Sequence, residues 1–283
     1  MLSRSTGESR GLAAAVLALA LVLFPAIPSP SAAAEKGSLR VTHVDNEGFL
    51  LEAGGRKVLV DGLFGRNPTY IDLDASVRSR VENARGAFAG VDLILASHYH
   101  ADHFDAGAVS RHLQANPEAV FVSTPQAVAQ LRKRPEFEGL RERVRAVYPK
   151  ENRRERLPEL GLEVLNLHHG RNRRPLVENL GLVIHLGGFK VLHVGDTEVT
   201  REELEASGLG KDGIDLALIP DWLLVHPPWK GMVEAVVSPR HLVAAHLRAG
   251  YGAEDFARIE KASPGALILR KPLETRTFRR AAE

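Results

Sequence analysis

Cysteine is absent from this chain of 283 residues. Its absence excludes disulfide bonds, thiolate zinc sites, iron–sulfur clusters, cysteine nucleophiles and lipid anchors attached to cysteine. Any metal ion that the chain binds must therefore have nitrogen and oxygen ligands. The 12 histidines of the sequence are the source of nitrogen.

A large excess of charge of one sign is also missing. The chain has 37 lysines and arginines against 35 aspartates and glutamates, and its formal net charge is +2. This balance gives no support for a protein that binds nucleic acid through its overall charge, and we expect no nucleic-acid partner. With 44% hydrophobic residues, the composition is that of a packed globular protein and not of a disordered or collagen-like chain.

The apolar run from Leu12 to Phe24 is too short to cross a bilayer, which takes about 20 residues. Two arginines precede the run, and prolines and small residues up to Ala34 follow it. This order is typical of a secretory signal peptide, with an uncleaved anchor as the alternative. We predict a signal peptide over residues 1–34 and a single domain over residues 35–283, periplasmic or secreted and without a stable membrane anchor.

Hydrophobic patterning predicts strands and helices in alternation, with an antiparallel opening and no linker that splits the chain. The predicted strands cover residues 39–44, 49–53, 57–60, 91–97, 119–123, 162–167, 180–186, 190–194, 216–219, 242–245 and 266–269. The predicted helices cover residues 75–85, 106–116, 126–132, 201–206, 232–237 and 253–261. Gly54 and Gly55 predict a hairpin turn, and the charged segment 132–156 is expected to be a solvated helix face or loop. This order indicates a mixed α/β fold of two similar halves.

A dense group of metal-binding residue types follows the predicted strand 91–97, in the order His98-Tyr99-His100-Ala101-Asp102-His103. If the strand continues to His100, its two-residue alternation points His98 and His100 to one side, where both reach one metal. Asp102 and His103 then face a neighbouring position. Three histidines and a carboxylate this close together are costly to solvate unless they bind something.

Further ligands follow other predicted strands, at the sheet edge where such a site needs them. His168 and His169 follow residues 162–167, Asp196 follows residues 190–194, and His246 follows residues 242–245. We predict one metal held by His98, His100 and His169, a second held by Asp102, His103 and His246, and Asp196 as the bridge between them. A shared water would fill the position that each metal leaves open.

Three of these assignments have alternatives in the sequence. Neighbouring residues of an extended chain alternate in direction, so only one of His168 and His169 is expected to be a ligand, and we favour His169 beside Gly170. Asp196 is also the residue type of a helix N-cap. His246 lies among apolar residues, as a buried core histidine does.

The motif His98-x-His100-x-Asp102-His103, followed by a later histidine, a Gly-Asp pair and a final histidine, resembles the metallo-β-lactamase superfamily. The resemblance covers about 150 residues, and Val60-Asp61 also resembles the start of that family. It implies a four-layer αββα sandwich with the metals at one edge of its two sheets. The sequence resembles the lactonase-like and phosphodiesterase-like branches of the family most, because its β-lactamases generally lack the bridging aspartate that Asp196 supplies.

These expectations together predict an exported dinuclear hydrolase that uses a metal-bridging hydroxide to cleave an ester, lactone or phosphodiester bond of a small molecule. Asp102 is predicted to orient the water, and the two divalent metals are expected to be zinc, although manganese and iron accept the same ligands. Arg171, Arg173, Arg174 and Lys230 favour an anionic substrate if they ring the metals. The alternatives are a non-catalytic metal-binding or partner-binding module and a β-lactamase.

Overall fold

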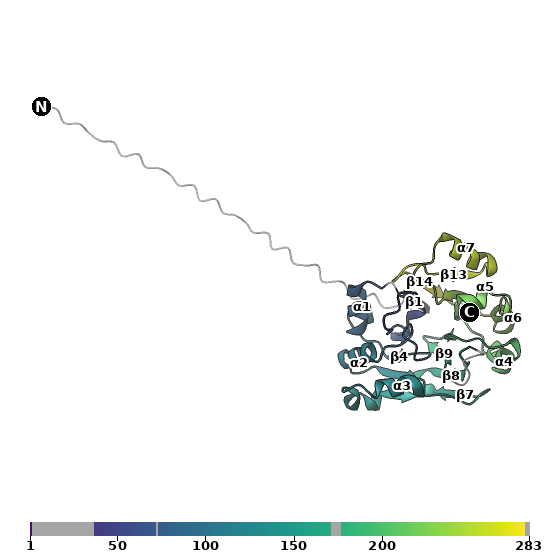
Figure 1. Ribbon diagram of the computed structural model, residues 1–283, viewed down its shortest axis with the longest axis horizontal. Coiled ribbons are helices and arrows are strands. Elements are labelled where there is room, and N and C mark those ends of the chain that lie inside the picture. Colours follow the sequence, from purple (N-terminus) through teal and green to yellow (C-terminus); the bar gives the residue numbers. More distant parts are fainter. Residues whose placement is uncertain (2–36, 72, 171–176, 281–283) are drawn as a thin grey trace.

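The computed structural model describes Met1 and residues 37–71, 73–170 and 177–280. Within these ranges the chain forms two seven-stranded sheets, with helices on the outer side of each sheet (Figure 1). Apart from Met1, the predicted signal peptide over residues 1–34 lies outside the described residues.

The first sheet has the strand order β14-β1-β2-β3-β4-β5-β6. Its strands are β1 (Ser38–Asp45), β2 (Gly48–Ala53), β3 (Arg56–Val60), β4 (Leu93–Leu95), β5 (Val120–Ser123), β6 (Val144–Ala146) and β14 (Thr275–Arg279). The strands from β14 to β3 pair antiparallel and those from β3 to β6 pair parallel. Gly54 and Gly55 form the β2–β3 turn with φ of +59° and +77°, so the predicted hairpin is confirmed.

The second sheet has the strand order β13-β12-β11-β10-β9-β8-β7. Its strands are β7 (Arg154–Leu157), β8 (Leu162–Asn166), β9 (Leu180–Leu186), β10 (Phe189–His193), β11 (Leu216–Pro220), β12 (His241–Ala245) and β13 (Ala266–Ile268). Strands β7 to β10 pair antiparallel and β10 to β13 pair parallel. Each sheet therefore joins an antiparallel part to a parallel part, as expected of two similar halves.

The helices cover the outer faces of the two sheets (Figure 1). They are α1 (Ala75–Glu82), α2 (Ala106–Ala115) and α3 (Pro125–Leu131) on the first sheet, and α4 (Arg201–Ala206), α5 (Asp221–Val225), α6 (Met232–Val236) and α7 (Ala253–Ala262) on the second. Local chemistry sets their starts, because Asp105 and Thr124 accept backbone N–H bonds as the N-caps of α2 and α3. In the described ranges we find no helix with the length and hydropathy to span a membrane.

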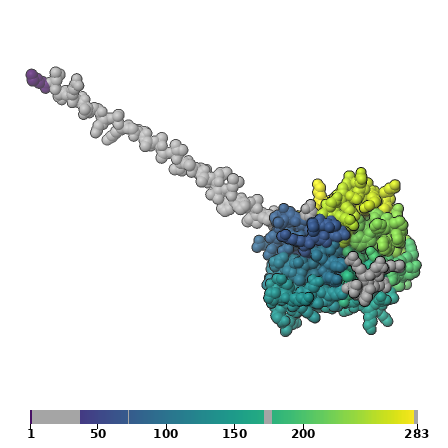
Figure 2. Space-filling model, viewed as in Figure 1, coloured from purple at the N-terminus to yellow at the C-terminus, as the bar shows by residue number. Residues whose placement is uncertain are grey.

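Three hydrophobic clusters separate the four layers. The central cluster joins side chains of both sheets, among them Leu51 and Leu182, and the outer clusters pack α1–α3 and α4–α7 onto their sheets. Figure 2 shows the earlier, blue and teal part of the sequence on one side and the later, green and yellow part on the other. The predicted αββα sandwich is confirmed.

The expectation for the charged segment 132–156 is wrong in part. Most of the segment is loop and short turns, but it contributes β6 and the start of β7, which are edge strands of the two sheets. Edge strands tolerate charged residues because one side of each faces water.

Candidate metal centre

The predicted ligands meet at one edge of the two sheets, on the segments that follow four strands. His98, His100, Asp102 and His103 follow β4, His169 follows β8, Asp196 follows β10 and His246 follows β12. Two groups of them have ligand atoms within 4.8 Å of one another, and Asp196 belongs to both groups. Segments nearly 150 residues apart in the sequence therefore form one cluster.

The first group contains His98, His100, His169 and Asp196. The Nε2 of His98 lies 3.0 Å from the Nδ1 of His100, and the Oδ2 of Asp196 lies 3.5 Å from the Nε2 of His169. Burial, together with nearby His103, lowers the pKa of His98 well below its ordinary value. A neutral imidazole is the form that ligates a metal.

Strand alternation does not bring His98 and His100 together, and this part of the prediction is wrong. Strand β4 ends at Leu95, so both histidines lie beyond it. A series of turns brings them together instead, with the N–H of His103 donating to the carbonyl oxygen of His100. The histidine motif thus lies in a series of turns that directly follows β4.

The second group contains His103, His246 and Asp196 together with Glu47. The Oδ1 of Asp196 lies 3.1 Å from the Nε2 of His103 and 3.3 Å from the Nε2 of His246. The Oδ2 of Asp102 lies 3.4 Å from the Nε2 of His246 and 3.7 Å from the Nε2 of His103. Asp102 therefore lies beside the second group, in which Glu47 is the second carboxylate.

Asp196 lies between the two groups, with one oxygen toward each. Its Oδ2 faces the Nε2 atoms of His98 and His169, and its Oδ1 faces those of His103 and His246. Burial opposes its ionisation, yet His246 and His103 hold the pKa of Asp196 well below its ordinary value. Asp196 does not cap a helix, because the nearest helix, α4, begins after the N-cap Thr200.

Asp61 holds the inner side of the cluster. Its Oδ2 accepts from the hydroxyl of Ser97 at 2.6 Å and lies 2.9 Å from both the Nδ1 of His103 and the Nε2 of His193. These imidazoles hold the pKa of Asp61 below its ordinary value, although its burial acts in the opposite direction. A carboxylate on the second ring nitrogen fixes the tautomer and direction of a ligating histidine.

Asn179 joins the loops that carry Asp196 and His169. Its side-chain N–H groups donate to the carbonyl oxygens of Leu167 and Val194, and its Oδ1 accepts from the N–H of Asp196. Gly195 has a φ of +56°, and a Cβ there would lie 2.3 Å from the Oδ1 of Asn179. Of the Gly-Asp pair, Asp196 supplies the carboxylate and Gly195 allows the backbone to pass close to Asn179.

Glu47 was missed by the sequence reasoning. It lies in the turn between β1 and β2, where the letters Asp45-Asn46-Glu47-Gly48 resemble an exposed polar hairpin turn, and no local pattern distinguishes it from one. The structure instead buries the side chain completely. Burial raises the pKa of Glu47 to about 8.

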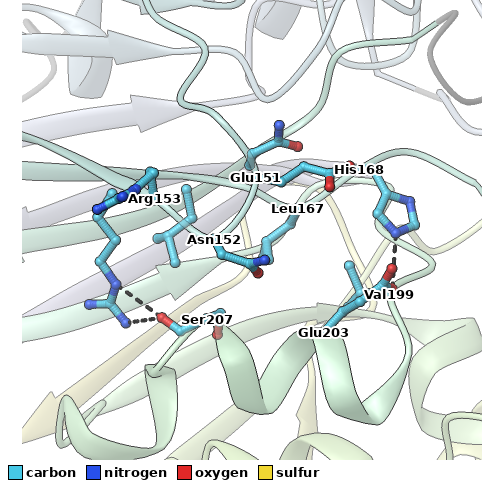
Figure 3. A pocket seen from close by; sticks show the side chains of 11 residues that line it. Glu151, Asn152, Arg153, Leu167, His168, Val199, Glu203 and Ser207 are labelled. Atoms are coloured by element: carbon cyan, nitrogen blue, oxygen red, sulfur yellow. Dashed lines mark hydrogen bonds and ion pairs between the residues drawn. The ribbon is translucent and has the colours of Figure 1, made fainter.

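The adjacent histidines point to different places. His169 joins the first group, whereas the Nε2 of His168 lies 3.1 Å from the Oε2 of Glu203 on α4. Figure 3 shows His168 and Glu203 facing each other at a separate cavity of about 150 Å³. Two further histidines lie on strands of the second sheet. His193 bonds to Asp61, whereas His241 is exposed at the start of β12 and contacts Phe278.

The residues of the cluster fit a pair of divalent metal ions. Among the described residues, both ring nitrogens of His169 and the Nε2 of His246 are buried without a hydrogen bond. Buried polar atoms normally have partners, and the Nε2 atoms of both histidines face carboxylate oxygens of Asp196 without bonding to them. Imidazole nitrogens with carboxylate oxygens are the donor set of zinc, manganese and iron sites.

A cavity of about 620 Å³ opens onto the cluster, and His100, Asp102 and His246 reach its wall. Tyr70 and Trp222 flank His246, with ring centroids 4.5 Å and 4.7 Å from its imidazole. Tyr70 and Trp222 thus form an aromatic wall of this cavity.

The basic residues expected near the metals are placed differently. Lys230 and Trp229 do not line this cavity, and Arg171, Arg173 and Arg174 lie outside the described residues. Arg248 and Arg258 instead line an adjoining cavity of about 330 Å³.

Comparisons with known proteins agree with this arrangement. Residues 56–253 match the family described as the beta-lactamase superfamily domain. A metal-dependent hydrolase from Pyrococcus furiosus is 27% identical over 213 residues, which cover 74% of this chain and 84% of the relative. Among solved structures, the metallo hydrolase Igni18 from Ignicoccus hospitalis has a TM-score of 0.60 at 19% identity, and the alignment covers 86% of this chain and 100% of Igni18. An isothiocyanate hydrolase from Delia radicum gut bacteria has a TM-score of 0.57 at 16% identity, and that alignment covers 85% of this chain and 100% of the hydrolase.

Proposed function

Since the chain belongs to the beta-lactamase superfamily, we propose that it is a metal-dependent hydrolase with two divalent metal ions. The observation that carries this proposal is the position of Asp196, whose two carboxylate oxygens face two separate groups of histidines. One carboxylate between two imidazole groups is the arrangement expected of a bridging ligand.

The ligand assignment follows the two groups. His98, His100 and His169 would hold the first metal, Asp102, His103 and His246 the second, and Asp196 both. Bound as a pair, the metals would lower the pKa of a shared water and polarise the bond that is cleaved. Zinc is proposed, because a site of imidazoles and carboxylates without cysteine suits it.

The chain's own residues would position the reactants. The side chain of Asp102 borders the cavity at the cluster, where it can accept a hydrogen bond from the attacking water and fix its direction. Asp61 holds the ring of His103 from the buried side. Tyr70 and Trp222 border the same cavity and would exclude water around the substrate.

The substrate is proposed to be a small ester, lactone or phosphodiester with an anionic group. Arg248 supports this proposal, because it lines the smaller cavity beside His246 and lies over the ring of Tyr70 at 5.8 Å. A guanidinium in this position offers paired N–H donors to a phosphate or carboxylate.

Export is also proposed, on the order of basic, apolar and small residues in the first 34 positions. Cell fractionation of the expressed full chain and N-terminal sequencing of the product test it. A product that begins at Glu35 outside the cytoplasm supports export, and a product that keeps residues 1–34 in the cytoplasm contradicts it.

The hydrolase proposal is tested by metal analysis and turnover together. Protein reloaded with zinc should contain two metal ions per chain and hydrolyse members of a panel of esters, lactones and phosphodiesters. His246→Ala, directly after β12, should lose metal and turnover. His241→Ala, at the exposed start of β12, should keep both. Bound metal without turnover on any substrate, a β-lactam included, would contradict the enzymatic part of the proposal, and absence of bound metal would contradict all of it.

A further inference from the structure

Glu47 comes to the metal centre on a buried turn. The turn joins β1 to β2, and its Asn46 has a φ of +49°. The side chain of Asn46 donates to the carbonyl oxygen of Asp102, and its own carbonyl oxygen accepts from the N–H of His246. Two loops that carry predicted ligands therefore hold the turn that carries Glu47.

The carboxylate of Glu47 has no ordinary partner. Its side chain is fully buried, and neither oxygen makes a hydrogen bond within the described part of the chain. Its Oε2 lies 3.4 Å from the Nδ1 of His103. Glu47 oxygens lie within 4.8 Å of ligand atoms in two groups, one formed with His103, Asp196 and His246 and one with Asp61 and His193. An isolated buried carboxylate is costly unless a cation or hydrogen bonds compensate it.

Orienting His103 does not explain Glu47. The Nδ1 of His103 already lies 2.9 Å from the Oδ2 of Asp61. Asp61 is in turn fixed by the backbone N–H and the hydroxyl of Ser97. One ring N–H bonds well to one carboxylate, so a second acid at 3.4 Å adds little to the direction of the imidazole.

The charge of the cluster points to a metal. Glu47, Asp61, Asp102 and Asp196 lie within one small region, and in the described residues none of them forms an ion pair with a lysine or arginine. With metals bound the ligating imidazoles are neutral, and the four carboxylates in ionised form would contribute four negative charges. Two divalent cations carry the same number of positive charges, so ionised Glu47 completes the neutrality of a filled centre.

From this burial, position and charge we propose that Glu47 is a further ligand of the second metal, beside His103, His246 and Asp196. It would bind from the buried side, while Asp102 approaches from the side of the cavity. The inference rests on the proposed two-metal centre. Glu47 would thus be a ligand on the β1–β2 turn, whereas the predicted ligands all follow β4, β8, β10 or β12.

The test compares Glu47→Gln with Glu52→Gln, the same change at another buried glutamate of this hairpin, which pairs with Arg40. Metal content is measured after dialysis, and the dissociation constant of each metal by competition with a chelator. Glu47→Gln should retain the first metal and bind the second about 10-fold to 100-fold more weakly. Glu52→Gln should bind both as the unmodified protein does.

Thermal unfolding separates a ligand from a structural residue. Without metal, Glu47→Gln should unfold at a temperature no lower than the unmodified protein, because burial disfavours the charged form of Glu47 and glutamine is neutral and of similar size. Its gain in unfolding temperature on adding zinc should be smaller. Unchanged affinity for both metals, with a lower unfolding temperature in the metal-free state, would overturn the inference.

A crystal structure of the zinc-loaded unmodified protein decides the matter if the variant does not fold. A Glu47 oxygen at about 2.0 to 2.2 Å from a zinc ion supports the ligand role. Two bound zinc ions with no Glu47 oxygen in contact overturn this inference and leave the proposed function standing. A protein that binds no metal overturns both.

Discussion

The Oδ2 of Asp61 lies 2.9 Å from the Nδ1 of His103, and this contact joins the third strand to the histidine motif. Asp61 immediately follows β3 and His103 lies in the loop after β4. The same oxygen reaches His193 on β10 of the other sheet, again at 2.9 Å. One carboxylate thus connects both sheets underneath the metal centre.

Asp61→Asn should weaken binding of the second metal by about 10-fold to 100-fold, because the amide no longer fixes the ring of His103 as a carboxylate does. It should also lower the free energy of unfolding by about 3 to 5 kcal/mol, since two buried histidines lose the negative charge of the carboxylate that they face. Chelator competition and urea unfolding measure the two effects. Asp92→Asn, at a carboxylate that accepts from the backbone N–H of Lys57 away from the metals, should leave metal affinity unchanged.

Equal metal loss in Asp92→Asn would show that the effect is a general loss of stability. Retention of full affinity in Asp61→Asn would contradict the orienting role. The two measurements therefore separate the contact with His103 from the contribution of Asp61 to folding.

Substitution of the adjacent histidines should have opposite consequences. His169→Ala should lose the first metal, because the Nε2 of His169 faces Asp196. His168→Ala should keep both metals and lose about 1 kcal/mol of stability, because the hydrogen bond to Glu203 on α4 is removed. Metal analysis and thermal unfolding of both variants check this. Metal loss in His168→Ala with retention in His169→Ala would reverse the assignment.

Arg248 should distinguish substrates by charge. Arg248→Ala should raise KM for an anionic ester or phosphodiester about tenfold, equivalent to about 1.4 kcal/mol, and leave KM for a neutral analogue unchanged. The effect should shrink at high salt, because salt screens the attraction. Arg276→Ala, on strand β14 at the far edge of the first sheet and paired with Glu274, is the matched control. Equal changes for both substrates would contradict an electrostatic role.

Gly195 should tolerate no side chain. Gly195→Ala should destabilise the fold by at least about 3 kcal/mol, because a Cβ would lie 2.3 Å from the Oδ1 of Asn179 in addition to the strain of positive φ. Gly90→Ala has a similar φ of +67° but no atom within 4 Å of the added Cβ, and should cost about 1 to 2 kcal/mol. Urea unfolding measures both. Equal losses would show that crowding at Asn179 has no effect.

The sequence allows prediction of the parts of the fold that follow local rules. Alternating and continuous apolar runs locate most strands, and the Gly54-Gly55 turn follows from positive φ. The short edge strands β6, β7 and β14 escape detection, because their solvent-facing side accepts charged residues. Strand β14 also pairs with β1, which is distant in the sequence.

The sequence allows prediction of the site residues that follow an apolar strand. His98, Asp196 and His246 are of this kind, and the structure brings them into one cluster. Glu47 instead lies in a polar hairpin turn, and its burial depends on contacts between that turn and the loops of Asp102 and His246. The same holds for Asn179, whose three bonds link loops that only the finished sandwich brings together.

The pairing of β14 with β1 has a consequence for the order of folding. The two strands are the last and the first of the described strands in the sequence. The proposed ligands span Glu47 to His246, so the second group is complete only after β12 has joined its sheet. We therefore expect metal uptake to be a late step of folding, because contacts this distant along the sequence form slowly.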